Sequence, residues 1–333
     1  KRAKMLNVAL VGFGYWGPNI ARNINNNPNL NLHTICDMID ENLEKAHKIY
    51  ASSTNYEKDF NKVLEDKTID IVAIATQTSS HYYLIKQALL AFKNVYVEKP
   101  FTATLQEAQE LEELAKKQNK IIHIDHIMIF HPAIKKIKEI ISSGEIGEVL
   151  FINSTRKSLG QFRKDVSSMW DLAVHDLSII DYLMDGKNPT SIKASGDKFY
   201  NPKESITFVN LKYENFSVHL ESNWLSPIKE RNITIVGSKK MLVYEDLKLE
   251  NKLTVYDKNV EVVSGENITD ENYLVKTNEF GTYSPYIKPE DALYNSIEHF
   301  RTSIINQTQS LSNPSQAIRV HKILEIADNN MNM

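Results

Sequence analysis

The first 125 residues alternate short apolar runs with helix-forming segments, and this alternation limits the possible folds more than any other feature. The runs with strand character are residues 6–11, 30–36, 69–75, 95–98 and 121–125. The segments with helical character between them are residues 18–25, 41–50, 80–92 and 104–118. Strands of about five residues separated by helices predict βαβ units and a parallel sheet.

The pattern changes after His126. Helices are predicted over residues 132–143 and 170–184, with a strand at 148–156 and a polar, irregular segment at 157–168 between them. Strand-like runs then follow one another at residues 205–213, 216–224, 232–236, 241–245 and 253–263. Because no long helix separates these runs, they predict a largely antiparallel, open sheet. A long loop over 264–288 and helices over 290–307 and 314–330 complete the prediction.

A glycine-rich motif joins the first predicted strand to the first predicted helix. Its residues are Gly12-Phe13-Gly14-Tyr15-Trp16-Gly17, a match to G-x-G-x-x-G in the context that dinucleotide binding requires. Gly12 permits the tight turn, Gly14 lets the backbone approach a pyrophosphate, and Gly17 lets the helix pack closely on the strand. The helix N-terminus, with Pro18 in its first turn, attracts the phosphates. All six residues of the motif are therefore candidate cofactor contacts.

An acidic residue ends the second predicted strand. Asp37 lies 20 residues after Gly17, the distance at which a carboxylate takes the ribose hydroxyls of a dinucleotide. It would repel a 2′-phosphate, and the neighbouring Met38 offers no cation to bind one. The sequence therefore favours NAD over NADP.

Length and composition narrow the remaining classes. At roughly 150 residues per domain, 333 residues predict two domains, which the change in pattern divides into residues 1–125, binding the dinucleotide, and 126–333, binding substrate and forming subunit contacts. A net charge of −3 without a block of like charge argues against nucleic-acid binding. A single cysteine, Cys36, excludes an intramolecular disulfide and a cysteine-cluster zinc site, and no metal site is predicted. No apolar run reaches the roughly 20 residues of a membrane span, so a cytoplasmic protein is expected.

A charged pair precedes a proline at the end of the 95–98 strand. Glu98-Lys99-Pro100 places a lysine at the carboxyl end of a parallel strand, where open α/β sheets bind ligands. A desolvated lysine there can serve as an acid/base group. Judged on this residue alone, a solvated lysine at the start of a loop fits equally well.

Taken together, these motifs resemble the Gfo/Idh/MocA oxidoreductases. The resemblance rests on the glycine motif, Asp37, the Thr76-Gln77-Thr78 turn, the Glu-Lys-Pro turn and the switch to an antiparallel sheet, and it covers essentially the whole chain. It implies an α/β protein with an N-terminal Rossmann domain and a C-terminal α/β domain that has an open, mostly antiparallel sheet. It also implies NAD(P), a sugar or cyclitol substrate, a catalytic Lys99, and Thr76, Gln77 and Glu98 near the cofactor.

Two segments of the second domain narrow this resemblance. Residues 158–165 and 170–176, together with Tyr15-Trp16-Gly17, look like the branch that oxidises nucleotide-linked N-acetyl sugars at C3. The branch includes UDP-N-acetylglucosamine and UDP-N-acetylglucosaminuronate 3-dehydrogenases, which serve amino-sugar biosynthesis. Related ketoreductases of nucleotide-linked deoxysugars share much of this layout.

Asp171 and His175 are the candidate substrate-side groups. Their i, i+4 spacing places them on one face of the predicted 170–184 helix. His175 can exchange a proton near neutral pH, and Asp171 could orient it or bind a sugar hydroxyl. Spacing alone favours a buried structural pair, whereas the family resemblance implies a catalytic histidine on this helix. Lys99 or His175 would then remove the C3 hydroxyl proton, and the sequence leaves open which of them is the base.

A nucleotide sugar carries a diphosphate, so cations are expected near it. Arg156 and Arg163 are candidates because arginine binds phosphate bidentately, although an ordinary surface arginine fits each position equally well. His126 lies after the last strand of the first domain and either lines the cleft or packs inside. His81 opens a predicted helix and either touches the cofactor or lies at the surface.

Three other functions compete with a UDP-sugar 3-dehydrogenase. Two keep the fold and change the substrate: an inositol or free-sugar dehydrogenase, and a deoxysugar ketoreductase. The third is a non-catalytic NAD-binding regulator, against which the presence of Lys99, Asp171 and His175 argues. Because an open sheet needs cover, a homodimer or homotetramer is expected.

Overall fold

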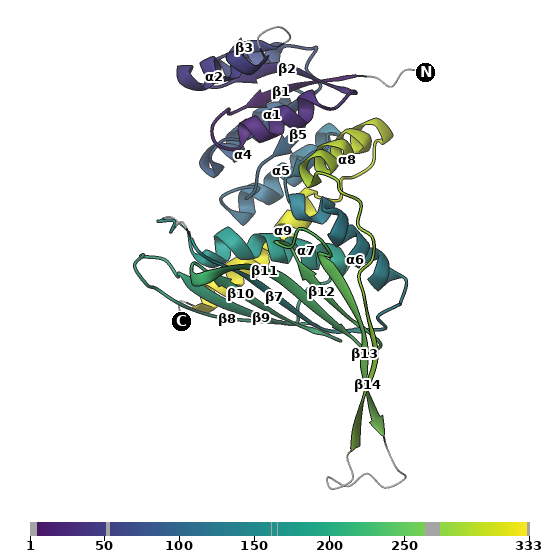
Figure 1. Ribbon diagram of the computed structural model, residues 1–333. Helices are drawn as coiled ribbons and strands as arrows, with labels where there is room; N and C mark the ends of the chain where they lie inside the picture. Colours follow the sequence, from purple (N-terminus) through teal and green to yellow (C-terminus); the bar gives the residue numbers. More distant parts are fainter. Residues whose placement is uncertain (1–4, 51–53, 161, 165, 264–273, 332–333) are drawn as a thin grey trace. The chain divides into compact units, whose positions relative to one another are not determined.

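A computed structural model describes residues 5–50, 54–160, 162–164, 166–263 and 274–331 (Figure 1). The chain divides into two compact units, one formed by residues 1–131 with 290–321 and the other by residues 132–289 with 322–333. The first unit thus takes in a late segment of the chain as well as the region before the predicted boundary at residue 126. The assignment of cofactor to one domain and substrate to the other stays a prediction.

The first unit is built on a six-stranded parallel sheet. Its strands are β1 (Leu6–Val11), β2 (Leu30–Cys36), β3 (Asn55–Glu57), β4 (Ile71–Ile74), β5 (Asn94–Val97) and β6 (Ile122–Ile124). They lie in the order β3-β2-β1-β4-β5-β6, with every pair parallel. This is the order of the doubly wound dinucleotide-binding fold, whose ligand site lies where the order reverses, between β1 and β4.

Helices cover both faces of this sheet. They are α1 (Gly17–Asn25), α2 (Asp40–Tyr50), α3 (Phe60–Glu65), α4 (Thr78–Leu90), α5 (Leu105–Gln118), α8 (Ala292–Asn306) and the start of α9 (Pro314–Met331), with a 3-10 turn η1 (Ile127–Phe130). The period of two along a strand sends alternate side chains into two cores. In β1, Val8 and Leu10 join the core that contains residues of α1 and α8, while Ala9 and Val11 join the core that contains residues of α4 and α5.

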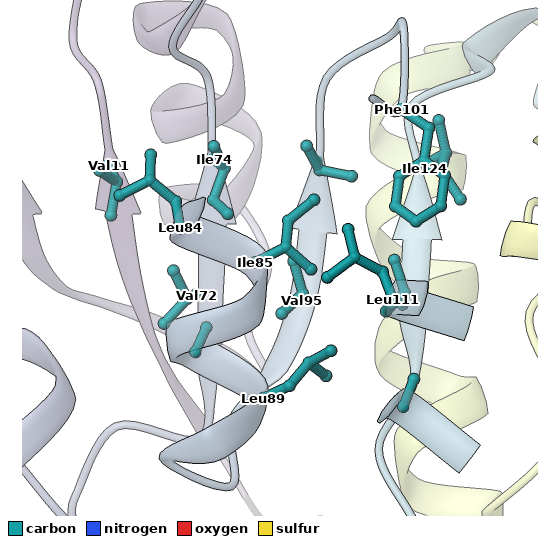
Figure 2. Close-up of a cluster of buried hydrophobic side chains, with 14 of the residues drawn as sticks. Val11, Val72, Ile74, Leu84, Ile85, Leu89, Val95, Phe101, Leu111 and Ile124 are labelled. Carbon is teal, nitrogen blue, oxygen red and sulfur yellow. The ribbon is translucent and has the colours of Figure 1, made fainter. Parts of the chain in front are cut away.

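The core around Ala9 and Val11 shows how α4 is held in place. Figure 2 shows Leu84, Ile85 and Leu89 of α4 directed at strand residues that include Val72 and Val95. Ile85 and Leu89 are fully buried. The helix is therefore fixed by burial of its apolar face, and its first turn is held over the carboxyl ends of β4 and β5.

The second unit is built on an eight-stranded sheet. Its strands are β7 (Val149–Leu159), β8 (Ser191–Asp197), β9 (Ile206–Lys212), β10 (Ser217–Asn223), β11 (Leu225–Gly237), β12 (Met241–Glu245), β13 (Leu253–Val263) and β14 (Leu274–Tyr283). Its helices are α6 (Pro132–Ser142), the π-helical turn η2 (Met169–Ala173), α7 (Val174–Leu183) and the end of α9. The strands lie in the order β14-β13-β12-β11-β7-β10-β9-β8, and within the described part of this second sheet only β7 and β10 pair in parallel.

One face of this sheet is covered by helices α6, α7 and α9 (Figure 1). Burial alternates along the strands, so that β10 reads as buried and half-buried positions in turn. This alternation is typical of an antiparallel sheet with one face on a core. The predicted α/β class, with a Rossmann sheet followed by a mostly antiparallel sheet, is thus confirmed.

Several local predictions are corrected. The short β3, α3 and β8 were not predicted, and β7 continues to Leu159 into the segment predicted to be irregular. The loop prediction over 264–288 is wrong for β14, while residues 264–273 lie outside the described part. β14 contains Asn, Glu and Gly281, which are less common in strands. It nevertheless pairs with β13 through a register shift at Asp257, where Gly281 takes a φ of +123°.

We expect truncation of the α4 core to destabilise the first unit. Ile85→Ala should lower the free energy of unfolding by about 2–5 kcal/mol, and Ile85→Val by about 0.5–1.5 kcal/mol, because each removes buried methyl groups and leaves a cavity. Urea denaturation followed by circular dichroism measures both. The control is Leu90→Ala on the same helix, where the side chain is 46% exposed and little change is expected. Equal effects at positions 85 and 90 would contradict this packing.

Candidate active site and cofactor loop

The candidate site begins with a row of residues across the first sheet. Val11 pairs with Cys36 and Ile74, Ile74 pairs with Val97, and Val97 pairs with Ile124, so five strands end level with one another. The next residues along these strands are Asp37, Gly12, Ala75, Glu98 and Asp125. The register therefore gathers three carboxyl groups and the glycine turn at the edge where such sheets bind ligands.

Backbone contacts explain two of the glycines. Gly12 has a φ of +93°, and a Cβ there would lie 2.9 Å from the carbonyl oxygen of Ala75. A Cβ on Gly17 would lie 2.2 Å from the carbonyl oxygen of Gly12. Neither position can take a side chain unless the backbone moves, so both glycines are required by the turn itself.

Gly14 differs from these two. It is exposed, and a Cβ built on it would meet no atom within 4 Å. Helix α1 starts three residues later with Pro18 in its first turn, no acidic residue there and no side-chain cap from Trp16. The open helix N-terminus and the bare backbone at Gly14 fit a pyrophosphate, since both offer N–H groups and space to an anion.

Asp37 holds the glycine loop to the end of β2. Its carboxylate accepts hydrogen bonds from the backbone N–H of Phe13 (2.7 Å), the backbone N–H of Ile39 (2.9 Å) and the Nδ2 of Asn42 (3.0 Å). Met38 beside it is 87% exposed, and so is Tyr15, at 96%. Met38 beside the acid and Tyr15 in the glycine loop thus offer exposed surface that suits an adenosine group, whereas the Phe13 side chain is buried against Tyr50.

His81 joins two of the loops at this edge. Its Nδ1 lies 3.0 Å from the carbonyl oxygen of Pro100 and its Nε2 lies 3.2 Å from that of Thr76. The side chain is 1% exposed, and burial lowers its pKa despite these carbonyl partners. The prediction of a surface position is therefore wrong, and the geometry favours a structural role between the two turns, while a cofactor contact by His81 stays a prediction. Thr76 Oγ1 lies 2.7 Å from Ser80 Oγ, and Gln77 is exposed at the start of α4.

The Glu-Lys-Pro turn lies where the sequence predicts it, directly after β5. The backbone N–H of Glu98 donates to Ile74, and the backbone N–H of Lys99 donates to Glu98 Oε2 (3.1 Å). Lys99 is half-buried, and the Lys99–Pro100 peptide bond is cis. Burial and the neighbouring Asp125 raise the pKa of Glu98 well above its usual value, and Lys99 opposes that shift.

In the second unit, Arg163 and Asp171 form an ion pair, with Nε and Oδ1 3.0 Å apart. The Arg163 side chain is 54% exposed and that of Asp171 is 16% exposed. Asp171 belongs to the π-helical turn η2, and His175 lies half-buried in the first turn of α7. The i, i+4 argument assumed one regular α-helix, so it does not apply as stated to this pair. π-Helical turns inside helices are often found at functional sites.

Arg156 is placed differently from Arg163. Its guanidinium is buried and donates to Asp176 from Nη2 (2.9 Å) and Nε (3.1 Å). The geometry favours a structural ion pair within the second unit, so a substrate contact by Arg156 stays only a prediction. His126 is likewise buried, with Nδ1 3.2 Å from Gln316 Oε1, which favours the packing alternative.

One residue of the row was not predicted to be functional. Asp125 ends the last predicted strand of the first domain, and its side chain is fully buried. The only signal available in the sequence was its position at the end of a predicted strand, as Glu98 is at the end of the preceding one. Among the described residues, no group of three or more His, Cys, Asp and Glu side chains is arranged to hold a metal ion, and no helix is long and apolar enough to cross a membrane.

We expect Gly14→Ala to separate cofactor binding from folding. The variant should unfold like the wild type because its Cβ meets no neighbour. Its Kd for NAD should nevertheless rise about tenfold or more, which is a loss of about 1.4 kcal/mol or more of binding free energy. Isothermal titration calorimetry measures the affinity and thermal denaturation the stability. Gly17→Ala is the comparison variant, and it should lose stability as well as affinity. Wild-type affinity in Gly14→Ala would rule out a close approach of the cofactor at this position.

Two family models match the chain. One, described as an oxidoreductase family with an NAD-binding Rossmann fold, matches residues 6–126, and the GFO/IDH/MocA C-terminal domain matches residues 134–243. A scyllo-inositol 2-dehydrogenase (NAD⁺) from Bacillus subtilis is 30% identical over 200 residues, which are 58% of each chain.

Solved structures agree with this match. The UDP-N-acetylglucosamine 3-dehydrogenase GnnA from Acidithiobacillus ferrooxidans superposes with a TM-score of 0.82 over 98% of both chains at 19% identity. An oxidoreductase from Agrobacterium radiobacter, in complex with NAD⁺, L-tartaric acid and magnesium, has a TM-score of 0.80 at 18% identity and covers 99% of this chain and 97% of its own. At these identities the structures show a common fold. With both family models matched in order, the chain belongs to the GFO/IDH/MocA family and is an NAD-dependent oxidoreductase with an N-terminal Rossmann domain.

Proposed function

We propose that this oxidoreductase oxidises the C3 hydroxyl of a nucleotide-linked N-acetyl sugar, UDP-N-acetylglucosamine or its uronate, to the 3-keto sugar. The observation that carries the proposal is the exposed guanidinium of Arg163, held 3.0 Å from Asp171 in the π-helical turn that precedes α7, the helix that contains His175. An exposed arginine suits a diphosphate, and a neighbouring carboxylate suits a sugar hydroxyl. The resemblance of residues 158–165 and 170–176 to the 3-dehydrogenase branch supports the same substrate.

The proposed chemistry takes Lys99 and His175 as acid/base groups, as the family resemblance implies. Bound NAD⁺ supplies the hydride acceptor. Lys99, at the carboxyl end of β5, is the favoured base for the C3 hydroxyl proton, and His175 shares that proton. Asp171 orients His175 or binds a sugar hydroxyl. A well-placed acid/base group contributes roughly 10²–10⁴-fold to the rate.

A second candidate substrate is an inositol or a free sugar. The similarity to scyllo-inositol 2-dehydrogenase favours it, since this is a dehydrogenase with 30% identity over more than half of the chain. Such a substrate has no diphosphate, so it gives no role to an exposed arginine beside Asp171. The deoxysugar ketoreductase differs only in substrate and direction, whereas a non-catalytic regulator would require neither Lys99 nor His175.

We further propose that the enzyme works in the cytoplasm as a homodimer or homotetramer in amino-sugar biosynthesis. The face of the second sheet opposite α6 and α7 supports an oligomer, and so does the β13–β14 hairpin (Figure 1). On this hairpin Val260, Val262 and Phe280 are 54%, 54% and 71% exposed. Apolar side chains gathered on such an edge are typical of a surface that contacts another chain.

We expect Arg163→Ala to raise KM for a UDP-sugar about tenfold or more, which corresponds to one charge-assisted hydrogen bond, and to leave the rate with free myo-inositol unchanged. Arg163→Lys keeps the charge without the bidentate geometry and should be intermediate. NAD⁺ reduction is followed at the nicotinamide band across UDP-sugars, free sugars and inositols. Lys187→Ala, which removes an exposed cation after α7, is the control. Activity that is indifferent to the nucleotide would exclude the proposed substrate.

We expect Lys99→Ala to lose roughly 10²–10⁴-fold in turnover while still binding NAD, because the variant removes the proposed base and leaves the glycine loop intact. His175→Ala should lose less if Lys99 is the direct base. Steady-state kinetics and a separate NAD titration measure the two effects. Unchanged turnover in Lys99→Ala would remove Lys99 from the mechanism, and a wild-type protein inactive on the whole panel would favour the regulator.

A further inference from the structure

Three side chains that interact with one another around Asp125 each contain a buried polar atom. These atoms are Trp16 Nε1 in the glycine loop, Glu98 Oε1 after β5 and Asp125 Oδ2 after β6. Within the described part of the chain, none of them has a partner at ordinary hydrogen-bond geometry. Buried polar atoms without partners are rare in native proteins, so three in one place need an explanation.

The strand register places the two carboxyl groups side by side. Val97 and Ile124 are paired, and the backbone N–H of Asp125 donates to the carbonyl oxygen of Val97 (2.8 Å). Glu98 and Asp125 are the next residues on these parallel neighbours, so their side chains leave the sheet on the same face. Two carboxylates buried together cannot both be ionised at ordinary cost, because each disfavours the charge of the other.

The surroundings distinguish the two acids. Asp125 Oδ1 accepts from Ser296 Oγ of α8 (3.3 Å), and the Tyr96 hydroxyl and the Trp16 indole also face this carboxyl. Burial raises the pKa of Asp125, whereas the neighbouring polar side chains of Glu98, Tyr96, Trp16 and Ser296 all lower it. Within the described residues, the Glu98 carboxyl accepts one hydrogen bond, from the backbone N–H of Lys99 (3.1 Å). The negative charge is therefore better stabilised on Asp125, and the proton belongs on Glu98.

We propose that Glu98 and Asp125 share one proton, carried by Glu98 Oε1 and donated to Asp125 Oδ2, and that Asp125 is a positioning residue for both the cofactor loop and the lysine turn. The shared proton gives both oxygens a partner, and the remaining orphan, Trp16 Nε1, donates to the same anion. One buried carboxylate thus binds the glycine loop, the end of β5 and helix α8.

The arrangement also sets the charge next to Lys99, which rests on the proposed role of that lysine as a base. With one shared proton, the Glu98–Asp125 pair places one negative charge near Lys99 rather than two. Fewer neighbouring carboxylates lower the pKa of an ammonium group, so it loses its proton more easily. Tyr96 also faces the pair, and burial keeps its hydroxyl protonated by raising its pKa. His123 Nε2 lies 2.8 Å from Ser296 Oγ, the hydroxyl that also contacts Asp125. This histidine is kept neutral because burial lowers its pKa.

The first test needs neither substrate nor cofactor. At pH 7 the infrared spectrum of the wild type should contain the carbonyl band of a protonated carboxylic acid, and Glu98→Gln should lose it. Ser310→Ala is the matched control, because Ser310 contacts His123 (2.8 Å) in the same buried network without touching the pair, and it should keep the band. A wild type without the band, or a Glu98→Gln variant that retains it, would overturn the proposal.

The second test is the pH dependence of stability. The folded state keeps a proton on Glu98 above the ordinary pKa of 4.5, where the unfolded chain has lost it. This contribution to stability is therefore lost as pH rises from about 4.5 toward the raised folded pKa. Over that window the unfolding constant of the wild type should increase up to about tenfold more per pH unit than that of Glu98→Gln. Parallel profiles would contradict a shared proton, whatever the enzyme oxidises.

The third test addresses positioning. Asp125→Asn removes the neighbouring charge, so Glu98 should ionise and place a carboxylate directly beside Lys99. The pH profile of NAD⁺ reduction should then move to higher pH by about one unit, whereas Ser310→Ala should leave it in place. A folded Asp125→Asn enzyme with an unmoved profile would exclude control of Lys99 by the pair. If Lys99 has no role in turnover, the first two tests still decide the shared proton.

Discussion

The register of the first sheet is the constraint on which the site depends. Because Cys36, Val11, Ile74, Val97 and Ile124 lie in one row, the residues after them must lie in the next. A shift of one residue in any strand would turn its side chains to the opposite face. The two cores that fix the register are filled by alternate side chains of the same strands, so the packing that stabilises the sheet also sets the positions of Asp37, Gly12 and Glu98.

Most of this row could be predicted because local patterns specify it. The strands 6–11 and 30–36 occur with the predicted ends. The helix predicted over 104–118 also occurs, and it begins at a capping box in which Thr104 and Glu107 make both hydrogen bonds. The glycine motif is equally local, since contacts of 2.2 and 2.9 Å leave no room for a side chain at Gly17 and Gly12. Patterns of this kind depend on neighbours in the chain or on the adjacent strand.

The rest depends on contacts that sequence spacing does not show. Arg156 and Arg163 were equivalent candidates, but Arg156 is 7% exposed and bonded to Asp176, which is 20 residues away in the chain. The role of Asp125 requires knowledge of which strands are adjacent and what α8 contributes. The π-helical turn at Asp171 has no sequence signature, and β14 resembles a loop because its edge position lets polar residues and a glycine occupy a strand.

The late segment of the first unit has a consequence for how the protein is made. Leu293, Ile297 and Phe300 of α8 fill the same core as β1 and α1, although the whole of the second sheet lies between them in the chain. During synthesis, the amino-terminal sheet therefore waits with one apolar face incomplete until α8 has been translated. Nascent chains usually fold domain by domain from the N-terminus. In this protein the first unit begins to fold first, but α8, which completes its core, is synthesised only after the second sheet.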